Sequence, residues 1–301
     1  MKTIITLVLW GLIMGCSTQD FRNNSIYKNT ELIFDKATTK SKGTILLIHG
    51  TAPQNLDGQI PIPEITKAMP NHYLTLPTYK NLSRELNELG WDTVRYTRLG
   101  VYHTKVNIDE YSKTDLNNIM GQLKEIWSMI PNNKPKIAFA WSGGSVHLLQ
   151  LPLQDADGIV ILGGIATKRT EVYELSTKNE KELSGLKEYL SNILSQEGKI
   201  ERTKMLSKDM SYGRFYDENN LKDNWTYLKN YQKLPTLILH GENDEDVHIS
   251  QAKVWKDKLP DNKITTIFGK NRNHIYSTSK SPQNMRKLAK TMNNWLLEYE
   301  K

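Results

Sequence analysis

The chain has 301 residues, of which 38% are hydrophobic and 24% are charged, and its formal net charge is +7. These values are typical of a soluble globular protein and leave room for one large domain with an insertion, or at most two domains. No block of lysine and arginine is concentrated enough to indicate a nucleic-acid-binding surface, because lysine and glutamate alternate along most of the predicted helices. We therefore interpret the basic excess as a solvated surface.

The first fifteen residues have the features of an export signal. Lys2 precedes an apolar run over residues 4–13, which is too short to span a bilayer because spanning takes about 20 apolar residues. A small residue stands directly before Cys16, and this pattern resembles the lipobox of bacterial lipoproteins. The resemblance implies a signal peptide over residues 1–15 and lipidation of Cys16 after cleavage. Residues 16–29 would then form a polar, lipidated tether.

Cys16 is the only cysteine in the chain, so the sequence has no disulfide framework. Several acyl chains at this position would anchor the protein stably, since each buried methylene contributes about 0.8 kcal/mol. We therefore expect an exported bacterial lipoprotein of the cell envelope, held at the membrane through Cys16. Ser17 resembles the residue that follows the cysteine in lipoproteins passed on to an outer membrane, which would place the protein on the periplasmic face in a Gram-negative cell. An ordinary signal peptide with a chance cysteine is the alternative.

From residue 30 to residue 301, short apolar runs alternate with amphipathic segments. The apolar runs predict strands at residues 43–48, 91–96, 137–140, 158–162, 235–240 and 263–268. Apolar residues at three- and four-residue spacing predict a helix that stops at Gly90, one over 114–130, one after Ser142, and two more at 250–259 and 282–299. Strands that are apolar throughout are typical of a parallel sheet buried on both faces. The alternation therefore predicts an α/β domain over residues 30–301, with a mostly parallel, doubly wound sheet.

The alternation is interrupted between about residues 165 and 234. This segment is strongly charged, and one helix within it has an apolar face formed by Leu183, Leu186, Leu190 and Ile193. A stretch rich in tyrosine and asparagine follows at residues 212–231. We interpret the segment as a helical cap insertion that covers the site, rather than as a separate domain.

Residues 136–149 combine a strand, a serine and a helix, and they point most directly to chemistry. Ser142 lies at the strand-to-helix corner, with Ala140 two residues before it and Gly144 two residues after it. Such a corner forces the serine into a strained backbone conformation that points its hydroxyl outward, and only very small side chains fit at the flanking positions. Gly143 leaves a backbone N–H unobstructed beside the hydroxyl, and the helix that starts here points its positive end at any oxyanion that forms. Ser142 is therefore the candidate nucleophile, although the short pattern alone also fits a plain strand-end turn.

A serine hydroxyl needs a base to take its proton and an acid to orient that base. His274 lies on the loop between the last predicted strand and the last predicted helix, where the base is expected. The acid is expected after the preceding strand, and we choose Asp244 there over its neighbours Asp246 and Glu242. The three candidates then stand in the chain order serine, acid, histidine.

This order, with the motifs around it, makes the chain from about Gly43 to Tyr299 resemble an α/β-hydrolase of the serine type. The motifs are the His49-Gly50 loop, the Ala-Trp-Ser-Gly-Gly elbow over residues 140–144, the His-Gly-x-x-Asp-x-x-Val turn over residues 240–247, and the late His274. The first elbow position is alanine where many members have glycine, a small departure that resembles known lipase variants. The resemblance implies the α/β-hydrolase fold, and an oxyanion held by the backbone N–H groups of Gly143 and Thr51, with Ala52 as the alternative to Thr51.

A few further residues are candidates for lining the site. Trp141, next to the nucleophile, either forms a wall of the acyl pocket or belongs to the core, and His103 or His248 could line the site. No Cys/His or carboxylate cluster predicts a metal, and there is no Gly-x-Gly-x-x-Gly phosphate-binding motif. We expect neither a metal nor another cofactor, and no nucleic-acid partner.

The sequence therefore predicts a lipid-anchored serine hydrolase that cleaves carboxylic esters through Ser142, His274 and Asp244 and an acyl-enzyme. The same triad could instead serve a serine peptidase or a thioesterase, in which glutamates of the cap (Glu171, Glu174, Glu182) would meet a free amino group. A binding lipoprotein that has kept the fold and lost turnover is the third hypothesis. The substrate we expect is a small ester or acyl compound.

Overall fold

The computed structural model describes residues 19–20, 30–63, 67, 72–177, 180–195, 201–207, 210–231, 233–259, 263–278, 281 and 284–299. The predicted signal peptide, Cys16 and most of the predicted tether lie outside the described residues. Gln19 and Asp20, within the predicted tether, form a short strand that pairs with the edge of the central sheet. Among the helices of the described segments, none has both the length and the apolar character that a membrane span requires.

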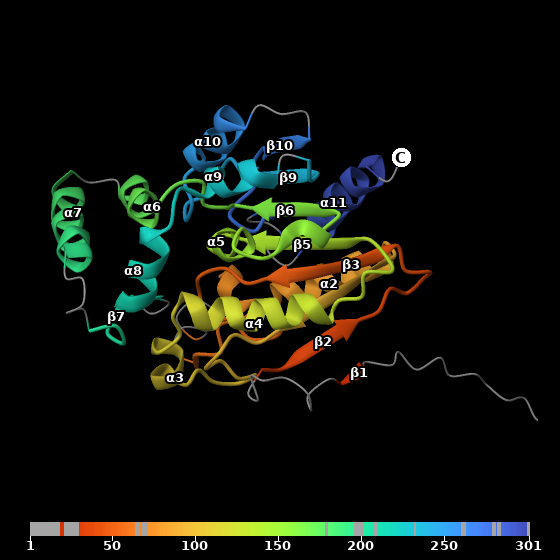
Figure 1. Cartoon of the computed structure of the whole chain (residues 1–301), viewed down its shortest axis with the longest axis horizontal. Coiled ribbons are helices and arrows are strands. Elements are labelled where there is room, and N and C mark those ends of the chain that lie inside the picture. Colours follow the sequence, from red (N-terminus) through yellow and green to blue (C-terminus); the bar gives the residue numbers. More distant parts are fainter. Residues whose placement is uncertain are drawn as a thin grey trace, which may run out of the picture.

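An eight-stranded sheet forms the centre of the molecule, in the order β1-β2-β4-β3-β5-β6-β9-β10 (Figure 1). Its strands are β1 (Gln19–Asp20), β2 (Leu32–Asp35), β3 (Gly43–Ile48), β4 (Trp91–Tyr96), β5 (Lys136–Trp141), β6 (Gly158–Leu162), β9 (Thr236–Gly241) and β10 (Ile264–Gly269). The six strands from β4 to β10 in this order are parallel, and only β1 and β2 run antiparallel to their neighbours. The mostly parallel, doubly wound sheet predicted from the sequence is therefore present.

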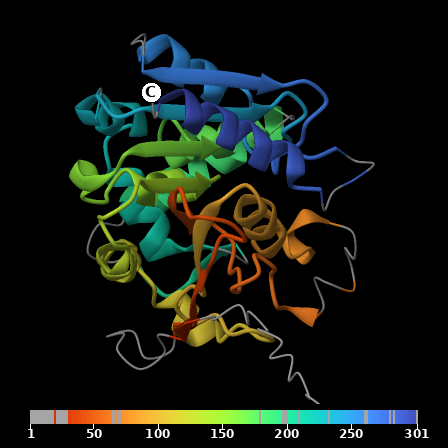
Figure 2. The same ribbon diagram turned by 90° about the vertical axis from the view of Figure 1, so that its right-hand side faces the viewer.

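Successive residues of each central strand face opposite layers of core, as the two-residue period of a strand requires. In β3, Leu46 and Ile48 join one apolar cluster, whereas Ile45 and Leu47 join the other. The first cluster is covered by α4 (Leu116–Met129), α5 (Gly144–Leu148) and α10 (Ser250–Lys258), and the second by α2 (Thr78–Glu88) and α11 (Arg286–Tyr299). Figure 2 shows the sheet between these layers, with α4 on one side and α2 and α11 on the other. Burial on both faces explains why most residues of β3, β5 and β6 are apolar.

The segment between β6 and β9 contains the predicted helix, α7 (Glu180–Ser195), and most of the elements that the sequence reading left unassigned. The unassigned elements are α6 (Arg169–Ser176), β7 (Met205–Ser207), β8 (Met210–Ser211), α8 (Tyr212–Asn220), α9 (Asn224–Leu228) and the 3-10 turn Lys229–Tyr231. Figure 1 shows α6, α7 and α8 beyond the end of the sheet at which β5 and β6 finish. Leu190 and Ile193 of α7 pack with Met210, Tyr212 and Phe215 in a small apolar cluster of their own. The segment is therefore held together partly by its own core.

Four elements of the main domain differ from the sequence reading. The helix after Ser142 is short and ends at Leu148, and α11 begins at Arg286, four residues later than predicted. A short helix, α3 (Ile108–Ser112), and the edge strand β2 were not predicted, because each is too short to show a clear period. None of these differences moves the C-terminal ends of β3, β5, β6 and β9, which meet at one edge of the sheet as in other parallel sheets.

Candidate active site

Ser142 occupies the corner between β5 and α5 in a conformation that non-glycine residues rarely adopt. Its φ is +55°, in the left-handed region, and its backbone N–H donates to the carbonyl oxygen of Leu162 at 2.8 Å. That hydrogen bond ties the corner to the end of β6, so the strain is held by the sheet. The side chain is only partly buried and lines a pocket of about 190 Å³. The predicted strained, outward-facing serine is therefore present.

The two glycines after Ser142 are required by close packing. A β-carbon on Gly144 would collide with the carbonyl oxygen of His49 and would lie 2.9 Å from that of Ile48, because α5 starts directly against β3. A β-carbon on Gly143 would collide with the Thr51 hydroxyl and with the guanidinium group of Arg169. The sequence reading anticipated the small residue at Gly144, but not that the space beside Gly143 is filled by side chains from two other segments.

Asp244 and His274 form a buried pair at the ends of β9 and β10. The Nδ1 atom of His274 lies 2.7 Å from Oδ2 of Asp244. The other carboxylate oxygen accepts the backbone N–H groups of Asp246 and Val247 at 3.0 and 2.9 Å, which fixes the orientation of the carboxylate. Because an ionised carboxylate only accepts hydrogen bonds, Nδ1 of His274 carries the proton and Nε2 is left with its lone pair. This is the tautomer that a general base needs.

The charges of the pair stabilise each other. Burial opposes the charged form of His274, but the Asp244 carboxylate, with a contribution from Asp246, raises the pKa of the imidazole above its ordinary value. Burial alone would raise the pKa of Asp244, and the charge and hydrogen bond of His274 outweigh it, so the pKa of the carboxyl is lowered. Asp244 is therefore ionised at neutral pH, and the imidazole is poised to accept a proton.

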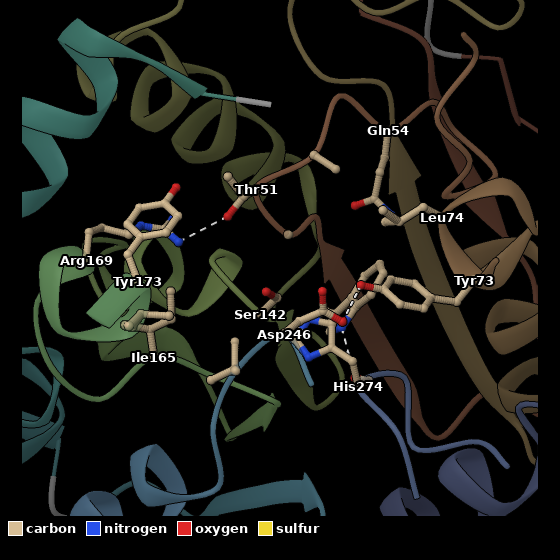
Figure 3. A pocket seen from close by; sticks show the side chains of 15 residues that line it. Thr51, Gln54, Tyr73, Leu74, Ser142, Ile165, Arg169, Tyr173, Asp246 and His274 are labelled. Atoms are coloured by element: carbon tan, nitrogen blue, oxygen red, sulfur yellow. Dashed lines mark hydrogen bonds between the residues drawn. The ribbon is translucent and has the colours of Figure 1, made fainter. Parts of the chain in front are cut away.

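The pocket brings the predicted nucleophile and base to one place. Both Ser142 and His274 line it, and Figure 3 shows the Ser142 hydroxyl on the side of the pocket where the His274 ring lies. Asp244 does not line the pocket but lies behind the imidazole, where both it and His274 are buried. Three residues from the ends of three strands are thus arranged as an exposed hydroxyl, a buried base and an acid behind the base.

The loop after β3 supplies the second predicted oxyanion residue. Thr51 lines the pocket beside Ser142, and among the described residues neither its backbone N–H nor that of Gly143 donates a hydrogen bond. The Thr51 carbonyl oxygen accepts from the Tyr111 hydroxyl at 2.8 Å and from Nη1 of Arg98 and Arg214 at 2.8 and 3.1 Å. Because these donors fix the Thr51–Ala52 peptide unit, the loop is held rigidly next to the nucleophile. Arg98 also donates to the carbonyl oxygens of Gly50 and Ala52.

A cluster of buried charges lies behind this loop and was not anticipated from the sequence. Glu218 is fully buried and accepts from Nε of Arg169 at 2.6 Å and from Nε of Arg214 at 2.7 Å. Nε2 of His147 lies 2.8 Å from the same carboxylate. Burial opposes ionisation of Glu218, but Arg169, Arg214 and His147 hold its pKa well below the usual value. Burial lowers the pKa of His147 to about 4, so its imidazole is neutral at pH 7.

On the side of Ser142 that faces away from Arg169, the pocket is lined by the acid Asp246. Asp246 accepts a hydrogen bond from the Tyr73 hydroxyl at 2.6 Å, and the Tyr73 ring lies 5.8 Å from the ring of His274 (Figure 3). Asp246 is exposed, whereas the buried Asp244 is the acid hydrogen-bonded to Nδ1 of His274, at 2.7 Å. Glu242, the other acid considered, is exposed and does not line the pocket.

Of the residues predicted to line the site, Trp141 lies in the pocket wall, whereas His103 and His248 do not. Trp141 is both a wall of the pocket and part of the core, and its indole Nε1 donates to the His274 carbonyl oxygen at 3.1 Å. The structure does not bring His103 to the site, because its side chain is exposed and outside the pocket lining. His248 is likewise exposed, with its Nδ1 3.0 Å from the Ser250 hydroxyl.

One group in the described part of the chain places metal-ligating atoms close together, namely Asp244, Asp246 and His274, with these atoms within 4.8 Å of one another. A cation at this point would compete with the hydrogen bonds already made by Asp244, which occupy both of its carboxylate oxygens. The donor set therefore fits an acid–base pair better than a metal centre.

Comparisons with known proteins agree with this geometry. Residues 200–301 match the model of the prolyl oligopeptidase family, Peptidase_S9. No curated protein sequence matches the chain. Among solved structures, a monoglyceride lipase from Saccharomyces cerevisiae has a TM-score of 0.58 at 16% identity, over 90% of this chain and 92% of that one. A thermophilic esterase from Thermogutta terrifontis also has a TM-score of 0.58, at 13% identity, over 94% and 99%.

A third similar structure is Est1E from Butyrivibrio proteoclasticus, with ferulic acid bound, which has a TM-score of 0.57 at 11% identity, over 90% of this chain and 95% of that one. These matches extend over nearly the whole chain and follow the same sheet. The chain has the α/β-hydrolase fold. In this fold the strand-end positions of Ser142, Asp244 and His274 lie at the edge of the sheet where ligands bind in open α/β proteins.

The sequence reading missed several residues of the site. Arg98 lies just beyond the C-terminal end of β4, so its strand-end position was a usable signal. Arg169, Arg214 and Glu218 lie in the charged segment between β6 and β9, where nothing distinguishes them from their charged neighbours. Tyr73 lies on the long loop after β3, which shows no regular period.

Proposed function

We propose that the protein is a serine hydrolase that cleaves small carboxylic esters through an acyl-enzyme, with Ser142 as nucleophile, His274 as base and Asp244 as the orienting acid. The observation that carries the proposal is the buried Asp244–His274 pair on the wall of the pocket that contains the strained Ser142. The lipases and esterases among the similar structures, and the match to a peptidase family, support hydrolysis as the type of reaction.

The reaction follows from this arrangement. His274 Nε2 takes the proton of the Ser142 hydroxyl as its oxygen attacks the ester carbonyl carbon, and Asp244 stabilises the imidazolium that forms. The backbone N–H groups of Thr51 and Gly143 hold the resulting oxyanion, and each such donor contributes about 3 kcal/mol to transition-state stabilisation. His274 then gives its proton to the leaving alcohol, and an acyl group remains on Ser142. Water, deprotonated by the same imidazole, releases the acid and restores the serine.

The size of the pocket favours a small substrate. Its volume of about 190 Å³ is smaller than the roughly 300–1,000 Å³ of sites that bind drug-sized molecules. Ile165 and Val172 supply an apolar surface, and Trp141 packs beside the nucleophile. We therefore expect short acyl chains to be cleaved faster than long ones.

The direct test is hydrolysis of p-nitrophenyl acetate and butyrate by the wild-type protein and by Ser142→Ala. The proposal predicts measurable turnover by the wild type and none above the uncatalysed rate for the variant, with the same thermal unfolding midpoint because Ser142 makes no side-chain hydrogen bond to a described residue. Equal activity in the two proteins would end the proposal.

A peptidase or thioesterase is the second candidate, and the match to the prolyl oligopeptidase family over residues 200–301 is the observation that favours it. The cap glutamates expected to meet a free amino group do not support it, because Glu171, Glu174 and Glu182 are absent from the pocket lining. A panel of matched esters, thioesters and aminoacyl amides distinguishes the candidates. Failure to turn over any of them, together with failure of a fluorophosphonate to label Ser142, would instead favour a binding protein.

We also propose that the protein is a lipid-anchored bacterial lipoprotein of the cell envelope. The support is the sequence around Cys16, an apolar run followed by a small residue and the single cysteine. Expression of the full chain in a bacterial host with a labelled fatty acid should label the wild-type protein and leave Cys16→Ala unlabelled and uncleaved. Labelling of the variant would contradict the anchor without affecting the proposed activity.

A further inference from the structure

The pocket has a buried cationic wall that the proposed ester hydrolysis does not by itself require. Arg169 lines the pocket, and Figure 3 shows its guanidinium group pointing at Thr51, across the pocket from His274. Nη1 of Arg169 donates to the Thr51 hydroxyl at 3.1 Å. The group therefore lies next to the place where the scissile carbonyl of a substrate would bind.

Positive charges lie close together in this wall. Arg98, Arg169 and Arg214 are all buried, and Arg169 and Arg214 both form ion pairs with Glu218. Burial and the charge of Arg214 lower the pKa of Arg98. His147, the other group on Glu218, is neutral at pH 7. Two guanidinium groups thus share one carboxylate, and the third is repelled by one of them. Burial of unbalanced charge is costly, and proteins keep it mainly where a ligand or the reaction supplies the opposite charge.

A purely structural role explains only part of this arginine cluster. Arg214 and Arg98 donate to the backbone carbonyl oxygen of Thr51, and these hydrogen bonds position the loop after β3. Arg169 donates to no backbone carbonyl of that loop and instead lies on the pocket surface. Its Nη2 is in ion-pair contact with Glu218 at 2.5 Å. Arg169 therefore places its positive charge at the pocket beside the nucleophile.

The wall of the pocket opposite Arg169 contains a negatively charged residue, Asp246. Asp246 lies next to His274, and Ser142 lies between it and Arg169 in Figure 3. An anionic substrate group would be repelled from the Asp246 side and attracted to the Arg169 side. The pocket is therefore electrically asymmetric, and the asymmetry would orient a charged ester with respect to the nucleophile.

We propose that Arg169 binds an anionic group of the substrate, a carboxylate or a phosphate near the scissile bond, so that the preferred substrates are small acidic esters. This inference rests on the proposed hydrolase function and names its substrate class. Arginine suits the task because its planar group can donate two parallel hydrogen bonds to either anion. Approach of the anion to Arg169 would also offset positive charge in this wall.

The test compares esters that share a leaving group and differ in charge. p-Nitrophenyl butyrate is the neutral substrate, mono-p-nitrophenyl succinate has a terminal carboxylate, and the p-nitrophenyl ester of 3-phosphonopropionic acid has a phosphonate. The wild-type enzyme should hydrolyse at least one acidic ester with a kcat/KM at least about tenfold above that of the neutral ester, as expected for a hydrogen-bonded ion pair. The better of the two acidic esters identifies the anion.

Arg169→Gln should remove that preference, mainly through a higher KM for the acidic ester, and Arg169→Lys should restore part of it. The ratio of the two kcat/KM values within each variant is the readout, because a general loss of activity cancels in it. Lys168→Gln is the matched control, since Lys168 is the exposed neighbour of Arg169 and its replacement removes the same charge without touching the pocket. This control should keep the wild-type ratio.

The inference is overturned if the wild-type enzyme prefers the neutral ester or shows no preference, a result that does not depend on whether any variant folds. It is also overturned if Arg169→Gln keeps the preference for the acidic ester. Hydrolysis of the neutral ester alone would leave the proposed hydrolase function intact, whereas absence of all hydrolysis with no fluorophosphonate labelling of Ser142 would remove that function itself.

Discussion

The two walls of the pocket are built in different ways. The wall that contains His274 and Asp244 consists of short loops at the ends of two neighbouring strands, and its key contact joins residues 30 apart in the sequence. The wall that contains Arg169 joins the loop after β3 to the segment between β6 and β9, and its contact with Thr51 joins residues 118 apart. The first wall follows from the sheet, whereas the second exists only because the charged segment folds over the site.

This difference suggests that the two walls of the pocket have different roles. The sheet fixes the reacting groups, because parallel strands end at one edge and hold whatever follows them in place. The covering segment contributes charge, and charge selects among substrates rather than performing the reaction. Changes on the His274 wall should therefore abolish turnover of every ester, whereas changes on the Arg169 wall should alter the rate and the choice of substrate.

The largest expected effect on the His274 wall comes from Asp244→Asn. An amide can accept from Nδ1 less well and can force the wrong tautomer of His274, so kcat should fall by about 10⁴-fold, as in other serine triads. Steady-state kinetics on p-nitrophenyl butyrate measure the loss, and circular dichroism checks the fold. Glu242→Gln is the control, because Glu242 is an exposed acid on the same loop and should keep the wild-type rate. A loss below tenfold for Asp244→Asn would mean that another acid orients the base.

A smaller loss of kcat is expected from Arg98→Met, which alters the Thr51 side of the pocket. Arg98 fixes the carbonyl oxygens of the loop from Gly50 to Ala52, so its removal should let the Thr51 N–H drift from the oxyanion. We expect kcat to fall by about 10- to 100-fold with little change in KM, since the lost interaction acts in the transition state. Arg98→Lys should recover part of the rate. An unchanged kcat in a folded Arg98→Met protein would remove this positioning role.

The smallest effect is a shift in pH dependence from Asp246→Asn. Catalysis needs neutral His274, so the rate should rise with pH through the pKa of the imidazole, which lies above its ordinary value. Because Asp246 helps to raise that pKa, its neutralisation should move the midpoint of the acid limb to lower pH. The measurement is kcat/KM against pH for both proteins, with Asp109→Asn as a remote exposed control. A shift to higher pH would contradict the assignment of the limb to His274.

The sequence was most informative where the sheet imposes the structure. The sequence pattern predicted β3, β4 and β6 with their exact bounds and β5, β9 and β10 to within one residue. The signal was clearest in β3 and β6, because strands buried on both faces admit few polar residues. Strand β2 was missed, since it has four residues and only every second one is buried. The candidate catalytic residues could also be predicted, because they directly follow strands whose positions the sequence indicates.

The buried arginines beside the pocket could not be predicted in this way. Arg169 and Glu218 are two of many charged residues in the segment between β6 and β9, and both are buried where a hydrogen bond joins them across 49 residues. Nothing in the local sequence around either residue specifies that contact. His103 illustrates the reverse case, since the sequence reading considered it as a residue lining the site, yet its side chain is exposed.

The most direct test of the account is active-site labelling of the intact protein with a fluorophosphonate, followed by peptide mass spectrometry. The account predicts one adduct per chain, located on Ser142, whose formation rate increases with pH as His274 loses its proton and which is lost in Ser142→Ala. No adduct under conditions that label other serine hydrolases, or an adduct on a different residue, would contradict the assignment of Ser142 as the nucleophile.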